Sequence, residues 1–165
     1  MTRRERRRGG LIAAALLAVA TGAAWGHGFE VGDLEIGHPW TLAAPAVAPT
    51  AVAYLSVVNR GAAADRLVAA RSPLAERVEL HEIALVDGEA RMRPLPDGLE
   101  IAPGATVVLE PGGYHLMVFG RSAAWSEAGA IPLELEFAGA GTVTVELAVH
   151  TPEDAPAPVA ETHQH

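Results

Sequence analysis

The chain of 165 residues contains no cysteine, and this absence excludes several kinds of site. No disulfide can form within the chain, so its fold must be held together by its core. Thiol nucleophiles and zinc–thiolate sites are excluded, and so is a blue-copper centre, because that centre requires a cysteine ligand. Lysine is also absent, aromatic residues make up only 5%, and methionine occurs three times, Met1 included. The soft donor atoms that remain are methionine sulfur and histidine nitrogen.

The beginning of the chain has the three-part pattern of an export signal. An arginine-rich start is followed by an apolar run over residues 11–20 and by small residues over 21–26. The apolar run is too short to span a bilayer comfortably, so we expect a cleaved signal peptide (residues 1–26) and no lasting membrane insertion. Cleavage after Gly26 or after Ala24 fits this pattern, and export can follow the general or the twin-arginine route. We therefore expect the protein to be periplasmic or secreted.

Charge and length limit the classes of partner. Removal of residues 1–26 leaves seven arginines against nineteen acidic residues, a net charge of −12. Such an acidic chain disfavours nucleic acid and anionic membranes as partners, and it suits a carrier that attracts cations or basic docking surfaces. The length fits one domain, and we expect it to be a monomer.

The mature sequence predicts an all-β fold. Short runs of Val, Leu and Ile alternate with Gly and Pro turns, and no window keeps a helical period. Closely spaced strands of this kind predict a β-sandwich or small barrel with Greek-key connections over residues 27–150. The proline-rich residues 151–165 predict a disordered tail that contains histidine. The predicted strands are Leu34–Trp40, Ala51–Asn59, Asp65–Ala70, Arg77–Val86, Ala90–Leu95, Thr106–Glu110, Tyr114–Phe119, Ile131–Phe137 and Thr142–His150.

One histidine and one methionine share a predicted strand. Met117 lies two residues after His115 within Tyr114–Phe119. Because residues i and i+2 of a strand point to the same face, the His115 and Met117 side chains should project together. Leu116 then faces the opposite side, and so does Tyr114, which we assign to packing.

A hairpin that turns at Asp87-Gly88 would bring His81 close to Met92. With these two residues at the turn, Met92 lies opposite Ile83, and His81 is two residues from Ile83 on the same face. His81 and Met92 then become diagonal neighbours, about 7–8 Å apart at the backbone. A register slip of one residue would place the two side chains on opposite faces, so this prediction depends on the turn.

The two His–Met pairs offer donor atoms that suit monovalent copper. Thioether sulfur is soft, neutral and polarisable and prefers Cu(I), whereas imidazole binds copper in either oxidation state. Two methionines with one or two histidines would form a low-charge site that favours Cu(I) over Zn(II) and could release its ion to a stronger thiolate. The residues alone leave a second interpretation open, in which methionine packs and imidazole is merely exposed.

The spacing of these four residues resembles the motif of the periplasmic copper chaperones known as the PCuAC family. Ten residues separate His81 from Met92, twenty-two separate Met92 from His115, and Met117 follows. The family usually has twenty-one residues in the longer interval, and we place the extra residue in the turn-rich stretch Pro94–Gly113. The resemblance covers nearly the whole mature domain and includes the blocks His38-Pro39-Trp40, Ala53-Tyr54-Leu55, Val78-Glu79-Leu80-His81-Glu82, Met92-Arg93-Pro94 and Pro111-Gly112-Gly113-Tyr114-His115-Leu116-Met117.

The resemblance implies both a fold and a role. It implies a cupredoxin-like β-sandwich that binds Cu(I) through His81, Met92, His115 and Met117. It also implies a copper-accepting partner, either the subunit of cytochrome c oxidase that bears the CuA centre or a thiol-containing assembly factor. A protein of this kind is a chaperone for copper and not an enzyme.

Histidines near the two ends give an alternative. After cleavage at Gly26, His27 could chelate Cu(II) through its imidazole and free α-amine, and His163 and His165 could form an accessory Cu(II) site. A Cu(II) scavenger or a copper enzyme built on His27 is therefore the alternative function, and a metal-free interaction domain is a further one. We assign His38 to a structural role and His150 to a solvent-facing strand end.

Overall fold

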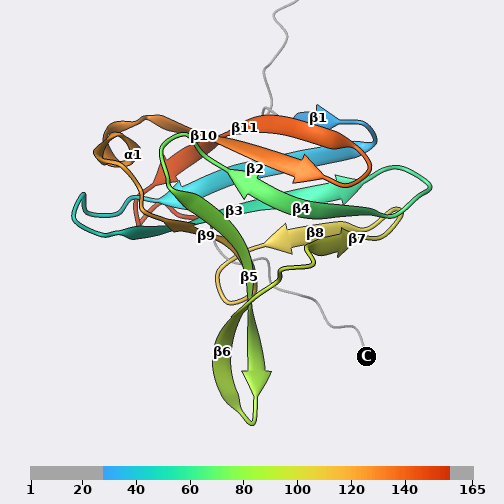
Figure 1. The fold of residues 1–165 in the computed structure, drawn as a ribbon, viewed down its shortest axis with the longest axis horizontal. Helices are drawn as coiled ribbons and strands as arrows, with labels where there is room; N and C mark the ends of the chain where they lie inside the picture. Colours follow the sequence, from blue (N-terminus) through green and yellow to red (C-terminus); the bar gives the residue numbers. More distant parts are fainter. Residues whose placement is uncertain (1–27, 157–165) are drawn as a thin grey trace, which may run out of the picture.

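The computed structural model describes residues 28–156, and every structural statement below concerns these residues. They form eleven strands and one short helix, arranged as Figure 1 shows. None of the helices in this part of the chain has the length and apolar character needed to cross a membrane. In chain order the elements are β1 (Phe29–Val31), β2 (Leu34–Leu42), β3 (Thr50–Asn59), β4 (Asp65–Arg71), β5 (Arg77–Val86), β6 (Glu89–Pro94), β7 (Leu99–Ile101), β8 (Thr106–Leu109), β9 (Tyr114–Phe119), α1 (Ala123–Glu127), β10 (Ala130–Phe137) and β11 (Gly141–His150).

The prediction of an all-β fold is confirmed, and each of the nine predicted strands is present with ends that agree within two residues. The sequence did not predict β1, β7 or α1. Each of these has only three to five residues, so none is long enough to show a periodic pattern.

The strands form a single hydrogen-bonded path that folds over on itself. The order along the path is β6-β5-β9-β8-β3-β2-β11-β10-β4-β7, with β1 added to β2. The β11–β2 and β8–β9 pairs are parallel and the other pairs are antiparallel. Strand β7, at one end of the path, also contacts β3 in its middle. The curled sheet therefore encloses one core.

The core follows from residue alternation along the strands. In β10 the side chains of Ile131, Leu133, Leu135 and Phe137 are buried, and the residues between them are more exposed. These side chains belong to one apolar cluster that also receives residues from β2, β3, β4, β7, β8, β9 and β11. Burial of each large aliphatic side chain contributes about 1.5–3 kcal/mol, and with no cysteine in the chain this cluster holds the domain together.

A β-bulge changes the face on which Trp40 lies. The β2–β3 register shifts by one residue between Gly37 and Trp40, and His38 within this bulge has a φ of 47°. Trp40 is buried, but it packs on Tyr54, with ring centroids 4.6 Å apart, and lies outside the main apolar cluster. The bulge therefore leaves His38 exposed and places Trp40 and Tyr54 together outside the main core.

The β5–β6 hairpin extends away from the body of the domain (Figure 1). Asp87 and Gly88 both have positive φ angles, 55° and 82°, which is the backbone of a type I′ turn. All six residues of β6 are exposed. On its other side, β5 pairs with β9 only as far as Glu82, so the end of β5 continues beyond the rest of the sheet. The hairpin thus carries Met92 to an exposed position.

Candidate metal centre

The two histidines of the predicted site face each other across neighbouring strands. His81 on β5 is the direct partner of His115 on β9. Both imidazoles are buried, and their ring centroids are 5.8 Å apart with an edge-to-face arrangement. The sequence did not predict that β5 and β9 are neighbours, and this pairing brings together residues that lie 34 positions apart.

Met117 lies on the same face, as predicted from its spacing to His115. It pairs with Glu79 of β5 on one side and with Val52 of β3 on the other. It is therefore a diagonal neighbour of His81, and its side chain is half-buried. Leu116, between His115 and Met117, is fully buried in the core, and Tyr114 packs against that core, as predicted.

Met92 occupies the position that the predicted hairpin register gave it. It pairs with Ile83, and His81 pairs with Pro94, so Met92 and His81 are diagonal neighbours on one face. The Met92 side chain is 51% exposed. Along β5, the His81–His115 pair lies between Ile83, the partner of Met92, and Glu79, the partner of Met117. An ion held over the two imidazoles can therefore be approached by a thioether from each side.

Each imidazole has one nitrogen with a hydrogen-bond partner and one without. Nε2 of His81 lies 2.9 Å from Oε2 of Glu79, and Nδ1 of His115 lies 3.2 Å from the carbonyl oxygen of Gly113. Nδ1 of His81 and Nε2 of His115 are buried and have no hydrogen-bond partner. A buried nitrogen with a free lone pair is the atom that a metal ion requires, and a hydrogen bond at the other nitrogen is the usual companion of a metal-binding imidazole.

Three further residues support the His81 ring. From the sequence, Glu79 could either orient the imidazole of His81 or be simply exposed, and nothing marked Arg77 or Phe119 as parts of the site. Glu79 accepts a hydrogen bond from Nε of Arg77 at 2.6 Å, in addition to its contact with His81. The contact with His81, followed by that with Arg77, lowers the pKa of the Glu79 carboxyl. The Arg77 guanidinium lies 4.0 Å from the centroid of the Phe119 ring, which is 6.2 Å from the ring of His81. The sequence placed Arg77 and Glu79 an even number of residues before His81, and Phe119 an even number after His115, so each shares a strand face with its histidine.

The donor set limits the kind of ion that fits. Within residues 28–156 no group of three or more His, Asp or Glu side chains is arranged to hold a metal ion. The His81–His115 pair would therefore need donors of another type to complete a site, and Met92 and Met117 are the sulfur atoms on that face. Two neutral imidazoles with two thioethers form a soft, uncharged set, which suits Cu(I) better than Zn(II), Ca(II) or Mg(II).

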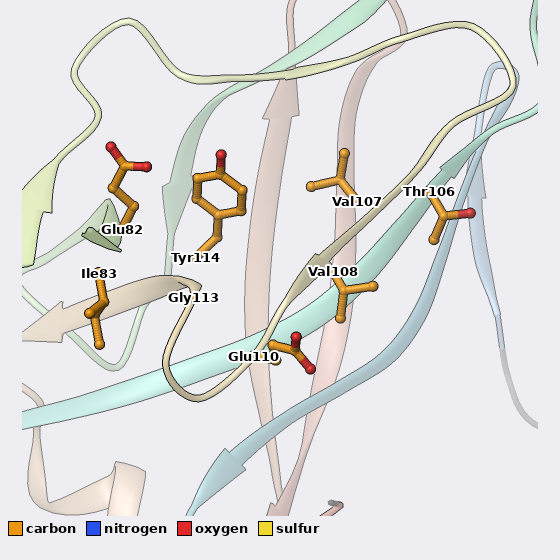
Figure 2. Close-up of a pocket in the computed structure, with 8 residues that line it drawn as sticks. All are labelled: Glu82, Ile83, Thr106, Val107, Val108, Glu110, Gly113 and Tyr114. Atoms are coloured by element: carbon orange, nitrogen blue, oxygen red, sulfur yellow. The ribbon is translucent and has the colours of Figure 1, made fainter. Parts of the chain in front are cut away.

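Two cavities are lined by residues other than these four. One, of about 400 Å³, lies between β5 and β8 and is lined by Glu82, Tyr114 and Val107 among others (Figure 2). Its carboxylate Glu82 is paired with Arg93. The other, of about 610 Å³, lies at the bulge and is lined by His38, Trp40, His150 and neighbouring residues. Neither cavity contains a predicted ligand of the Cu(I) site.

The remaining predicted histidines are placed as follows. His27, His163 and His165, together with residues 1–26, lie outside the described residues, so the signal peptide and the accessory Cu(II) sites stay predictions. His150 is less exposed than expected, because its ring packs edge-to-face on Trp40 at 5.8 Å. The first residues of the predicted tail form a turn, in which the Thr151 hydroxyl donates to Asp154 at 2.7 Å.

Comparison with known proteins identifies relatives over most of the chain. Residues 34–149 match the family described as "Putative lipoprotein LpqE-like". The "Putative lipoprotein Lxx21020" of Leifsonia xyli subsp. xyli (strain CTCB07) is 29% identical over 122 residues, which are 74% of this chain and 72% of that protein.

Solved structures show the same fold. The structure titled "apo PmoF2 PCuAC domain" is 31% identical, with a TM-score of 0.63, over 78% of this chain and 98% of that one. The structure titled "Copper-bound PCuAC domain from PmoF2" is 29% identical, with the same TM-score of 0.63, over 76% and 99%. The fold is therefore the cupredoxin-like β fold of PCuAC domains, as the sequence predicted.

Proposed function

The chain belongs to the LpqE-like family of putative lipoproteins, and from the donor atoms of the site and its likeness to PCuAC domains we propose that it is a copper chaperone of the cell envelope. It binds Cu(I) through His81, Met92, His115 and Met117 and passes the ion to an acceptor protein. The observation that carries this proposal is the pair of buried imidazole nitrogens without hydrogen-bond partners, Nδ1 of His81 and Nε2 of His115, on a face that also bears two methionines.

The identity of the ion is supported by its donors and by the relatives. Sulfur and neutral imidazole are the ligands that Cu(I) prefers, and the chain contains no thiolate that would compete. The PmoF2 relative is named as copper-bound, and this chain covers 99% of that domain at 29% identity. We extend copper binding to this chain on those two grounds.

The exposure of the ligands supports transfer rather than storage or catalysis. Met92, on the exposed hairpin, is the ligand that an incoming protein can reach first, whereas the two imidazoles are buried. Replacement of a thioether by an acceptor's sulfur can begin at Met92 while the histidines still hold the ion. The acceptor in this proposal is the CuA-bearing subunit of cytochrome c oxidase or a thiol-containing assembly factor, and no catalytic turnover takes place.

The proposed location is the cell envelope, either the periplasm or outside the cell. The arginine-rich and apolar beginning of the sequence supports export, and both the family and the Leifsonia relative carry the word lipoprotein in their names. The 165 residues contain no cysteine, so we do not extend the names to a lipid-modified cysteine in this chain.

A competition titration tests the proposal. The exported chain is titrated with Cu(I) against a chromophoric Cu(I) chelator, in the wild type and in the double variant Met92→Ala/Met117→Ala. Leu85→Ala is the matched control, because Leu85 is a large apolar residue, 78% exposed, on the same hairpin. We expect the double variant to lose tight Cu(I) binding and the control to keep it.

Unchanged Cu(I) affinity in the double variant would overturn the proposal. Deletion of residues 157–165 and removal of His27 test the alternative in a parallel titration with Cu(II) against a Cu(II) chelator. Tight Cu(II) binding that disappears with either change would support a Cu(II) scavenger or a copper enzyme instead.

A further inference from the structure

The two histidines of the site use different nitrogens for their hydrogen bonds. His81 contacts Glu79 through Nε2, the nitrogen far from its backbone, whereas His115 contacts the Gly113 carbonyl through Nδ1, the near one. The nitrogens left without partners are accordingly Nδ1 of His81 and Nε2 of His115. A neutral imidazole has one N–H and one lone pair, so the nitrogen that donates decides which nitrogen is free to bind a metal.

Both partners of these imidazoles can only accept a hydrogen bond. A carboxylate and a carbonyl oxygen have no proton to give, so the nitrogen that faces each of them must carry the N–H. We propose that Glu79 is a positioning residue that keeps the proton of His81 on Nε2 and thereby makes Nδ1 its metal-binding atom. His115, of the opposite tautomer, binds through Nε2. The identity of the metal rests on the proposed function.

Glu79 is itself held in place from its other side. Its second carboxylate oxygen accepts from Nε of Arg77 at 2.6 Å, and the Arg77 guanidinium lies over the Phe119 ring at 4.0 Å. Arg77, Glu79 and His81 are alternate residues of β5, so the strand presents all three on the face that carries His115. The cation restricts Glu79 to an orientation in which its other oxygen meets His81.

The choice of nitrogen determines where the ion lies between the strands. Nδ1 is closer to the backbone than Nε2, so an ion bound by Nδ1 of His81 lies close to β5. His115 reaches toward the same ion from β9 with its outermost nitrogen. The ion would thereby lie on the side of β9 that faces β5, and Met92 and Met117 are both diagonal neighbours of His81 there.

Nitrogen-15 NMR of the imidazoles tests this inference directly. Two-bond ¹H–¹⁵N correlation spectra of the uniformly labelled protein distinguish a protonated ring nitrogen from one with a lone pair. In the metal-free protein we expect the Nε2–H tautomer for His81 and the Nδ1–H tautomer for His115. Addition of Cu(I), which is diamagnetic, should shift Nδ1 of His81 and Nε2 of His115 and leave the protonated nitrogens in place.

The variant Glu79→Gln tests the role of the carboxylate. Its amide can either donate or accept, so it no longer imposes one tautomer, and we expect a mixture at His81 and a loss of Cu(I) affinity of about tenfold or more. Glu82→Gln is the matched control, because Glu82 is on the same strand, pairs with Arg93 and points away from His81. It should leave the His81 tautomer and the Cu(I) affinity unchanged.

The possible results separate this inference from the proposed function. Tight Cu(I) binding through Nε2 of His81 would overturn the inference and leave the chaperone proposal standing. Absence of Cu(I) binding would overturn the chaperone proposal, and the spectra of the metal-free protein would still decide which nitrogen Glu79 fixes. If Glu79→Gln kept a pure Nε2–H tautomer at His81 and wild-type affinity, the positioning role would be wrong.

Discussion

A buried nitrogen without a hydrogen bond lowers the stability of a folded protein by about 1–3 kcal/mol. His81 and His115 each bring one such nitrogen into the metal-free protein. Buried polar atoms without a hydrogen-bond partner are expected at functional sites, where a bound ligand supplies the missing interaction. Replacement of these histidines should therefore lower the free energy of unfolding of the metal-free protein less than replacement of other buried residues does.

Replacement of His115 by leucine should separate binding from stability. His115→Leu removes the nitrogen without a partner together with the weak contact to Gly113, and it keeps an apolar side chain in a buried position. We expect the free energy of unfolding of the metal-free protein to stay within about 1 kcal/mol of wild type or to rise, while Cu(I) affinity falls sharply. Urea unfolding and the competition titration measure the two quantities. Leu116→Ala, one residue further along, should instead cost about 2–5 kcal/mol.

The carboxylate of Asp65 ties the turn between β10 and β11 to β4. Its Oδ1 accepts from the backbone N–H groups of Arg66 and Gly139, both at 2.7 Å, and its Oδ2 accepts from that of Ala140 at 2.8 Å. Burial acts to raise the pKa of this carboxyl, but the three backbone hydrogen bonds outweigh it and lower the pKa. The ionised form is therefore favoured by folding.

Asp65→Asn should destabilise the protein at neutral pH and not in acid. An asparagine oxygen can replace Oδ1, but its NH₂ group then faces the N–H of Ala140, so we expect a loss of about 1–2 kcal/mol. A folded pKa below the unfolded value means that the stability gained from Asp65 is present above the unfolded pKa of about 3.9 and disappears as the pH falls through the folded pKa. Urea unfolding of both proteins from pH 7 to pH 3 measures this difference. A constant difference over that range would contradict the prediction.

At the scale of elements, the turn at Asp87-Gly88 allowed the sequence to predict that Met92 lies near His81. The approach of His81 to His115 could not be predicted in this way. Asp87-Gly88 specifies a type I′ turn, and this turn alone fixes the register that places Met92 opposite Ile83. The approach of His81 to His115 depends on the pairing of β5 with β9, for which the sequence has no local signal. The resemblance to the PCuAC family implied that both histidines bind copper, but it did not show which nitrogen of each ring lacks a hydrogen-bond partner.

The bulge in β2 illustrates a second limit of sequence patterns. Strict alternation along β2 puts Trp40 on the same face as Ile36, toward the core. One extra residue at the bulge reverses this and places Trp40 against Tyr54. Bulges arise from the fit between two strands, so the alternation of β2 gave no sign of this one.

Gly88→Val should weaken metal binding through the hairpin and not through the core. Gly88 has a φ of +82°, where a β-branched residue is strained by about 1–2 kcal/mol, and no atom lies within 4 Å of an added Cβ. Gly104→Val is the matched control, because Gly104 has a φ of +71° and equally open surroundings at a turn away from the site. We expect similar small losses of thermal stability in both variants and a loss of Cu(I) affinity in Gly88→Val alone. Equal Cu(I) affinity in the two would show that the turn does not position Met92.

At the scale of the whole molecule, the proposed site would couple metal binding to folding, because its four proposed ligands come from three strands. His81 is on β5, Met92 on β6, and His115 and Met117 on β9. The unfolded chain cannot bring these side chains together, so an ion bound by them binds the folded state selectively. Donors two residues apart, such as His163 and His165, are equally close in an unfolded chain. A site at the tail would therefore stabilise the fold much less.

Thermal unfolding with and without Cu(I) consequently reports which donors hold the ion. At a free Cu(I) concentration one thousand times the Kd, selective binding adds about 4 kcal/mol to the free energy of unfolding. For a domain of this size, that gain raises the Tm by on the order of 10–20 °C. The increase should disappear in Met92→Ala/Met117→Ala and persist when residues 157–165 are deleted, both measured by calorimetry under reducing conditions. An increase that survived loss of both methionines would place the ion on other ligands, because only donors assembled by folding can couple the two equilibria so strongly.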